Sequence, residues 1–109
     1  MSLTEADLKR AVIDYLEYGM NQGKWWFTRL NSGKAFVKRG GKEYMIQLCD
    51  EGTSDLLVVK QGKAIFIELK STKGKQSPAQ GAFQKLIQMQ GASYSIVHSL
   101  EELEELLGI

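Results

Sequence analysis

The segment TSDLLVVKQGKAIFIELKSTKG, residues 53 to 74, decides the fold. Two apolar runs flank Lys60-Gln61-Gly62-Lys63, a pattern typical of two antiparallel strands joined by a two-residue turn. Each run carries a carboxylate at the end away from the turn, Asp55 in the first strand and Glu68 in the second. A hairpin with the composition of a protein core therefore has charges at one end only.

With Gln61-Gly62 as the turn, Asp55 lies opposite Glu68, and opposed side chains project from the same face of a sheet. Lys70, two residues beyond Glu68, shares that face. The other face is apolar throughout: Leu56, Val58, Ile65, Ile67 and Leu69. The charged face is also apolar near the turn: Leu57, Val59, Ala64 and Phe66. We therefore expect both faces of this hairpin to be covered.

Two carboxylates about 5 Å apart repel by ~3 kcal/mol at an effective dielectric of about 20. Lys70 can neutralise the pair, a divalent cation can bind it, or one carboxylate can keep its proton. Paired carboxylates on rigid strands are good oxygen ligands for Mg²⁺. The alternative is an ion cluster of Asp55, Glu68 and Lys70 that only stabilises the end of the sheet.

The remaining elements follow from periodicity, caps and turn residues. Ser2 and Glu5 form a capping-box pattern, Gly19 offers a helix stop, and Ser77-Pro78 is a strong helix start. Before the hairpin, the expected elements are a helix over about residues 3 to 18, a strand over 25 to 30, a turn at 31 to 34, a basic loop at 38 to 42 and a strand over 44 to 49. After it come a helix from 77 to about 90, a strand over 94 to 97, and a short acidic helix from 99. Ser99 and Glu102 open that last helix with a second capping-box pattern. This order predicts an α/β fold with a central mixed β-sheet flanked by helices, and the connection from the hairpin through the residue 77–90 helix fits a parallel crossover.

The chain of 109 residues is long enough for one hydrophobic core, so residues 1–109 are expected to form a single domain. Its single cysteine, Cys49, excludes an internal disulfide and is expected to be a small buried residue. No secretory signal and no membrane-length apolar run is present, so we expect a cytoplasmic protein without a membrane partner. His98 has no sequence neighbour that suggests a role, and at least two of Trp25, Trp26 and Phe27 are expected in the core.

Charge is distributed unevenly along the sequence. Residues 24–85 contain twelve Lys/Arg and five Asp/Glu, whereas residues 1–23 contain two and four, and residues 86–109 none and four. A basic middle between acidic ends suits an anionic partner, of which nucleic acid is the commonest. Solvated lysines on exposed loops explain the same counts equally well.

Asp55, twelve residues, and then Glu68-Leu69-Lys70 resembles the PD-(D/E)XK nuclease superfamily. With Gly52-Thr53-Ser54 before it and Lys75-Gln76-Ser77-Pro78-Ala79-Gln80 after it, the segment is similar to the VRR-NUC family of that superfamily. Arg29-Leu30-Asn31-Ser32-Gly33 resembles that family's segment before the metal-binding strand. Members often have Pro directly before the metal-binding Asp, where this chain has Ser54.

The resemblance implies a small restriction-endonuclease-like fold and a metal-dependent DNA endonuclease. Asp55, Glu68 and the backbone carbonyl of Leu69 would bind Mg²⁺ or Mn²⁺. Lys70 would orient or activate the attacking water and stabilise the phosphorane charge, and Gln80 would help to position Lys70 or the water. Glu5 would approach the metal, or act only as a helix-capping residue.

The resemblance further implies a homodimer that acts on branched or four-way-junction DNA in the cytoplasm of a bacterial or phage-infected cell, with no organic cofactor. Polar and basic side chains near the site are candidates to bind the DNA backbone. They are Arg29, Asn31, Ser32, Lys34, Lys38, Arg39, Lys73 and Lys75. Two other functions stay open: a non-catalytic nucleic-acid-binding module on the same fold, and a structural subunit.

Overall fold

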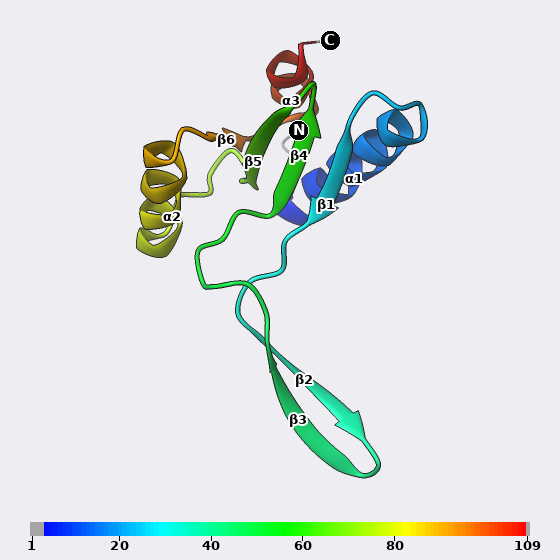
Figure 1. Cartoon of the computed structure of the whole chain (residues 1–109), viewed down its shortest axis with the longest axis vertical. Coiled ribbons are helices and arrows are strands. Elements are labelled where there is room, and N and C mark those ends of the chain that lie inside the picture. The colour runs from blue at the N-terminus through cyan, green and yellow to red at the C-terminus, as the bar shows by residue number, and fades with distance from the viewer. Residues whose placement is uncertain (1–3, 109) are drawn as a thin grey trace.

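The computed structural model describes residues 4–108, which form a small α/β protein with a four-stranded mixed sheet, three helices and a separate two-stranded ribbon (Figure 1). The elements are α1 (Glu5–Asn21), β1 (Trp26–Arg29), β2 (Lys34–Arg39), β3 (Lys42–Gln47), β4 (Leu56–Lys60), β5 (Lys63–Leu69), α2 (Pro78–Met89), β6 (Ser93–Val97) and α3 (Leu100–Leu107). The sheet order is β1-β4-β5-β6. The first three strands are antiparallel and β6 runs parallel to β5, so the predicted crossover through α2 is confirmed.

The β4–β5 hairpin has the predicted register. Lys60 pairs with Lys63 and Leu56 with Ile67 across the Gln61-Gly62 turn. Both turn residues have positive φ angles, 50° and 80°, as the tight two-residue hairpin turn requires. This register places Asp55 and Glu68 at the same end of the sheet, away from the turn.

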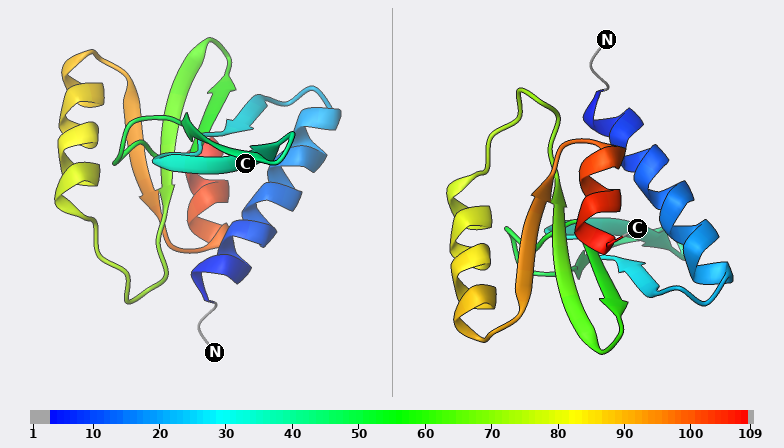
Figure 2. Two further views of the ribbon diagram at one scale, coloured as in Figure 1. Left: turned by 90° about the horizontal axis from the view of Figure 1, so that it is seen from below. Right: turned by 90° about the horizontal axis from the view of Figure 1, so that it is seen from above.

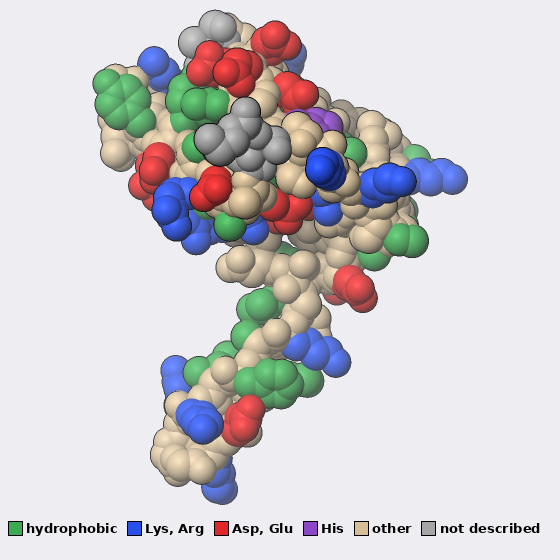
Figure 3. All heavy atoms as spheres, turned by 180° about the vertical axis from the view of Figure 1, so that it is seen from behind, with side chains coloured by type: hydrophobic (Ala, Val, Ile, Leu, Met, Phe, Trp, Pro, Cys, Tyr) green, Lys and Arg blue, Asp and Glu red, His purple; other side chains and the backbone are tan. Residues whose placement is uncertain are grey.

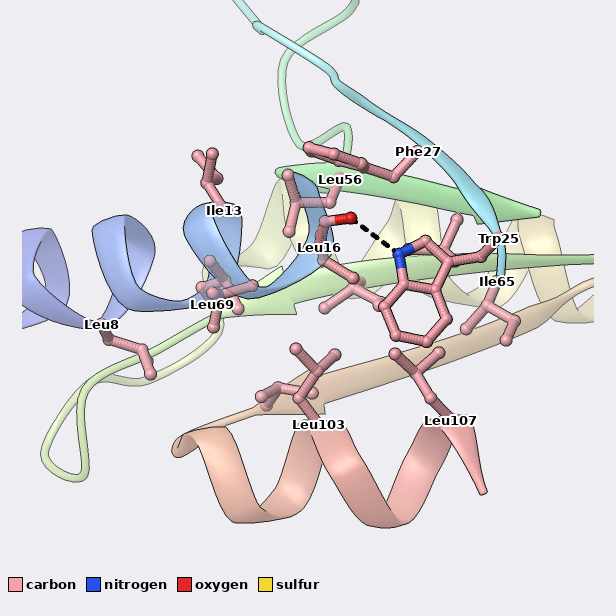
Figure 4. Close-up of a cluster of buried hydrophobic side chains, with 14 residues drawn as sticks. Leu8, Ile13, Leu16, Trp25, Phe27, Leu56, Ile65, Leu69, Leu103 and Leu107 are labelled. Carbon is pink, nitrogen blue, oxygen red and sulfur yellow. Dashed lines mark hydrogen bonds between the residues drawn. The ribbon is translucent and has the colours of Figure 1, made fainter. Parts of the chain in front are cut away.

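The face of the hairpin predicted to be wholly apolar is the core of the protein. All five of its side chains are buried: Leu56, Val58, Ile65, Ile67 and Leu69. Helices α1 and α3 cover this face, as the two views in Figure 2 show, and contribute leucines on their inner sides (Figure 4). Trp25 and Phe27 are buried here as well, whereas Trp26 is exposed, so the expectation that at least two of the three are core residues is confirmed.

The opposite face is covered only in part, which corrects the prediction for this side. Helix α2 lies on this face over β6 and β5, where Phe83 packs its ring edge-on against Phe66 and also near Tyr94. Closer to β1, Val59 remains 36% exposed. The apolar run predicted two covered faces because it does not show how far one helix extends across a sheet.

Helix α1 begins and ends later than predicted. Thr4 is its N-cap, with its hydroxyl accepting a hydrogen bond from the Asp7 N–H, so the cap assigned to Ser2 is wrong; Ser2 itself lies outside the described residues. The helix continues to Asn21, and Gly19 is a buried residue inside it rather than its stop. Trp25 packs its indole ring over Gly19 and donates from Nε1 to the Leu16 carbonyl at 2.8 Å (Figure 4).

Gly19→Ala is expected to destabilise the protein by about 2–4 kcal/mol, within the range for overpacked cores. A Cβ at Gly19 would lie 2.0 Å from the Trp25 ring, so the indole must move and lose its packing. Gly81→Ala is the matched control in α2, because its Cβ would meet nothing closer than 3.5 Å. That change should stabilise by up to about 1 kcal/mol, the usual helical preference for Ala. Chemical denaturation of the two variants tests the difference in sign.

Strands β2 and β3 form an arm that projects from the end of the sheet where Asp55 lies (Figure 1). Strand β2 was not predicted: its residues were assigned to a turn, to no element and to a basic loop. The overlooked signal is Gly40-Gly41 between two β-prone runs, a favoured hairpin turn; their φ angles are 57° and 78°. The arm explains a radius of gyration of 15.3 Å, against about 13 Å for a compact chain of this length.

Other boundaries agree with the sequence. Ser77 and Gln80 form a full capping box at the start of α2. Ser99 caps α3 through the Glu102 N–H, although the Glu102 carboxylate accepts from His98 instead of closing the second capping box.

Cys49, expected to be buried, is exposed, since it lies at the base of the arm. No helix within residues 4–108 is long and apolar enough to cross a membrane.

Candidate active site

The site lies where β4 begins and β5 ends, and the loop before Asp55 is held firmly there. Ser54 is fully buried and donates from Oγ to the Leu56 carbonyl at 3.2 Å. Gly52 has a φ of 90°, and a Cβ there would lie 2.4 Å from the Ala79 carbonyl oxygen. The loop therefore packs directly on the first turn of α2, and Ser54 has a structural role.

Asp55 uses its two carboxylate oxygens differently. Oδ2 accepts a hydrogen bond from the backbone N–H of Leu69 at 2.8 Å, which continues the link between β4 and β5 beyond their last strand pair. Oδ1 faces the ammonium of Lys9 at 3.7 Å. Lys9 lies on α1, 46 positions earlier in the sequence, and was not predicted as a site residue.

Glu68 is the most deeply buried charged group of the site, with 2% of its surface exposed. Its Oε1 accepts from Gln80 Nε2 at 3.0 Å and lies 4.0 Å from Lys70 Nζ. Its Oε2 is buried and has no hydrogen-bond donor among the described residues. A buried carboxylate oxygen without a donor is unfavourable, so a proton or a cation is needed to balance it.

The pKa of Glu68 is raised to about 8, first of all by burial. The charge of Asp55 also raises this pKa, whereas the charge of Lys70 lowers it. Such a pKa favours the protonated form of Glu68 at neutral pH when no metal is bound. Three ways to relieve the repulsion between Asp55 and Glu68 were predicted: Lys70, a divalent cation, or a retained proton. At 4.0 Å from Glu68 Oε1, Lys70 does not suffice by itself. In the metal-free protein, the retained proton relieves the repulsion.

Gln80 links the helix start to the carboxylates. Its side-chain oxygen accepts from the Ser77 N–H at 2.9 Å, and its side-chain amide donates to Glu68. The capping box thus fixes the rotamer that reaches Glu68. Gln80 was expected to position Lys70 or a water; in the structure its direct partner is Glu68.

The donor set suits a divalent cation that prefers oxygen ligands. Residues 4–108 contain no group of three or more His, Cys, Asp or Glu side chains that could hold a metal ion. Asp55 and Glu68 would therefore need the Leu69 carbonyl and waters to complete the coordination, and Mg²⁺ characteristically keeps several waters. The unpaired Oε2 of Glu68 fits such an ion, and Asp55 Oδ1 would become available to it once Lys9 moves away.

Glu5 is the exposed first residue of α1, and its charge is the last of the causes that raise the pKa of Glu68. It is thus near enough to act on the site electrostatically. Glu5 is the first helical residue after the Thr4 cap, so it does not hold the third helical position that a capping box requires.

A cleft of about 400 Å³ opens beside Asp55, between α1 and the base of the arm. Its polar lining consists of Lys9, Arg29, Asn31, Ser32 and Asp55. The structure therefore brings three of the predicted nucleic-acid-binding residues next to a predicted metal ligand.

No known family model matches this chain, and no curated protein matches its sequence. The resemblance to VRR-NUC nucleases rests on the motif residues that surround Asp55, Glu68 and Lys70.

The other predicted DNA-binding residues lie farther out. Lys34 is at the base of the arm, Lys38 and Arg39 are near its tip, and both Lys73 and Lys75 are exposed in the loop between β5 and α2. At about 3.3 Å per residue, the tip lies about 17 Å beyond Lys34. Lys38 and Arg39 therefore cannot contact the same phosphate as Lys70.

Tyr94 is a neighbour of the site that the sequence did not indicate. Its hydroxyl accepts from Gln76 Nε2 at 3.2 Å, and burial, with the charges of Glu68 and Asp55, raises its pKa. The polar Gln76–Tyr94 contact fastens the loop after Lys70 to the sheet. A single Tyr in a β-prone run gives no signal of this contact.

Proposed function

We propose that this protein is a divalent-metal-dependent DNA endonuclease with a restriction-endonuclease-like fold. The observation that carries the proposal is the convergence of Asp55, Glu68 and Lys70 at one end of the sheet, with Glu68 Oε2 buried and unpaired. An ion cluster that only stabilised the sheet would pair both carboxylates. This one leaves a buried carboxylate that needs a proton or a cation.

The residues have distinct tasks in phosphodiester hydrolysis. A bound Mg²⁺ or Mn²⁺ would polarise the phosphate and lower the pKa of a coordinated water. Asp55 and Glu68, with the Leu69 carbonyl, would hold that ion, and Gln80 keeps Glu68 in place. Lys70 would place its positive charge next to the attacking water and the developing charge on phosphorus.

The substrate class follows from the surroundings of the site. The cleft beside Asp55 supplies Lys9, Arg29 and Asn31 for a sugar-phosphate backbone, as non-specific DNA contacts require. The three helices within residues 4–108 carry few cations, with Lys9 and Arg10 on α1, Lys85 on α2 and none on α3. Selectivity for DNA shape, such as a branch or four-way junction, is therefore proposed over selectivity for sequence.

The test is cleavage of labelled duplex, single-stranded, flap and four-way-junction DNA in Mg²⁺, Mn²⁺ or EDTA. Metal-dependent cutting that depends on Asp55 is expected, with the junction cut best. If no substrate is cut and DNA binding is indifferent to metal, the protein is a binding module. If it neither cuts nor binds DNA, the ion cluster is structural.

We further propose that two copies associate through the arm. Phe36 and Met45 are 67% and 55% exposed on one face of the ribbon, and Figure 3 shows hydrophobic and basic side chains intermingled along it. The other face presents Val37, Tyr44 and Ile46 around a hollow of about 360 Å³. Exposed apolar surface of this extent marks an interaction site, and an isolated two-stranded ribbon is only marginally stable.

A second copy suits this surface better than DNA does. DNA offers little apolar surface, whereas the body of the chain exposes large apolar side chains on α2 and on the bare part of the sheet: Trp26, Val59, Leu86 and Met89. The arm carries four cations and one carboxylate, and α3 carries four glutamates. These features support the proposal: the exposed apolar side chains of the arm and of the body would cover one another in a pair of copies, and the opposite charges would attract.

Light scattering after gel filtration should give about twice the chain mass of 12.2 kDa. A Phe36→Ser/Met45→Ser double variant should shift the mass to that of one chain, because apolar contacts would be lost. Tyr18→Ser is the control, since it removes an exposed aromatic from α1, outside the arm. A single-chain mass for the wild type would reject the dimer, and weaker DNA binding by the double variant would then assign the arm to DNA.

A further inference from the structure

Lys9 occupies the side of Asp55 that a metal ligand must keep open. Its ammonium lies 3.7 Å from Asp55 Oδ1, whereas Oδ2 is already bound to the Leu69 N–H. Oδ1 is therefore the oxygen more available to a cation. A divalent cation and the Lys9 ammonium cannot share this position, because both carry positive charge.

The contact is easy to break. The Lys9 side chain is 47% exposed and that of Asp55 is 25% exposed. Ion pairs as exposed as this one contribute little to stability. Lys9 can therefore leave Asp55 without disturbing the core, into which α1 sends the neighbouring Leu8 instead.

The cleft provides the place to which Lys9 would move. Lys9 and Arg29 line it together, and Asn31 and Ser32 add hydrogen-bonding groups. Among the described residues, Asp55 is the one carboxylate in its lining. Once a cation neutralises Asp55, the lining of this cleft is positively charged and suits a phosphate.

We propose that this cleft binds the DNA phosphate next to the one that is cleaved, and that Lys9 exchanges between Asp55 and this phosphate when a divalent cation binds. Lys9 is a positioning residue in this scheme, with no part in the bond-breaking step. The inference rests on the proposed metal-dependent function, and it adds an energetic link between metal and DNA. The ion pair between Lys9 and Asp55 must break when either the cation or the DNA binds. Once one ligand has broken it, the other binds without that cost, so the two bind cooperatively.

Lys9→Met should therefore have opposite effects on the two ligands. Without DNA, the variant should bind Mn²⁺ about three- to tenfold more tightly than the wild type, since a competing charge is removed. In Ca²⁺, at conditions checked to give no cleavage, it should bind DNA about three- to tenfold more weakly, since a phosphate contact is lost. Isothermal titration calorimetry and fluorescence anisotropy measure the two affinities.

Arg10→Met is the matched control, because Arg10 is an exposed cation on the same helix that does not line the cleft. It should leave the Mn²⁺ affinity unchanged. Lys9→Arg should retain most of the coupling. Thermal melts in EDTA verify that each variant folds.

The outcomes separate this inference from the proposed function. If the wild type binds no divalent cation, the proposed function fails. If it binds and cuts as proposed but Lys9→Met leaves Mn²⁺ affinity unchanged, the exchange is wrong and the ion pair is structural. If Lys9→Met weakens both ligands, Lys9 does not compete with metal and the inference is overturned.

Discussion

Asp55→Asn is expected to reduce metal-dependent DNA cleavage by about a thousandfold or more, because metal catalysis contributes several kcal/mol to barrier lowering. The amide keeps an oxygen that can accept the Leu69 N–H, so the β4–β5 junction should remain intact. It removes the charge that would hold the cation beside Glu68. Mn²⁺ binding measured by calorimetry should be lost together with cleavage.

The fold should survive this change. The substitution loses only the exposed Lys9 ion pair and removes one of the causes that disfavour an ionised Glu68, so the melting temperature in EDTA should stay close to that of the wild type. Asp50→Asn is the matched control, since it neutralises an exposed carboxylate in the loop that leads to the site. Wild-type cleavage by Asp55→Asn, or cleavage that persists in EDTA, would contradict the assignment.

The metal-free protein should lose stability as the pH rises, with Glu68 as the cause. Its pKa is about 8 in the folded protein against an ordinary value of 4.5. Between these values the folded state holds a proton that the unfolded state has released, so the stabilisation present below pH 4.5 is lost as the pH rises toward 8. The full shift corresponds to a decrease of up to about 5 kcal/mol in the free energy of unfolding.

Glu68→Gln should flatten this dependence, because an amide has no proton to lose in this pH range. Urea unfolding at pH 5, 6, 7 and 8 in EDTA measures the slope. Glu51→Gln, which removes an exposed carboxylate from the preceding loop, should leave the slope unchanged. Saturating Mg²⁺ should restore stability to the wild type above pH 7 and have no effect on Glu68→Gln. Equal slopes in the two proteins would show that Glu68 ionises normally.

The sequence predicted those parts of the site that depend on short-range geometry. A two-residue turn fixes which residues face each other, so Asp55 and Glu68 could be placed together from the hairpin alone. The capping residues of α2 were equally clear, because Ser77, Pro78 and Gln80 each satisfy a known requirement of a helix start. These interactions act between residues within one element or one turn.

Contacts between distant elements were not predictable in this way. Lys9 reaches Asp55 because of the angle at which α1 crosses the sheet, and no local pattern encodes that angle. Strand β2 was missed for another reason: the Gly40-Gly41 turn was assigned to a basic loop, so the strand predicted over 44 to 49 had no hairpin partner. Incomplete covering of the sheet near Val59 likewise depends on where α2 lies.

The two ends of the arm lie next to each other at its base. The chain departs at Gly33 and comes back at Leu48 and Cys49, and two hydrogen bonds of 2.9 Å close this base, from the Leu48 N–H to the Gly33 carbonyl and from the Gly33 N–H to the Cys49 carbonyl. Strands β1 and β4, on either side of it, are already neighbours in the sheet. The length and the surface of the ribbon can therefore change without moving the sheet that carries Asp55 and Glu68. Such changes could arise in evolution or be introduced by design.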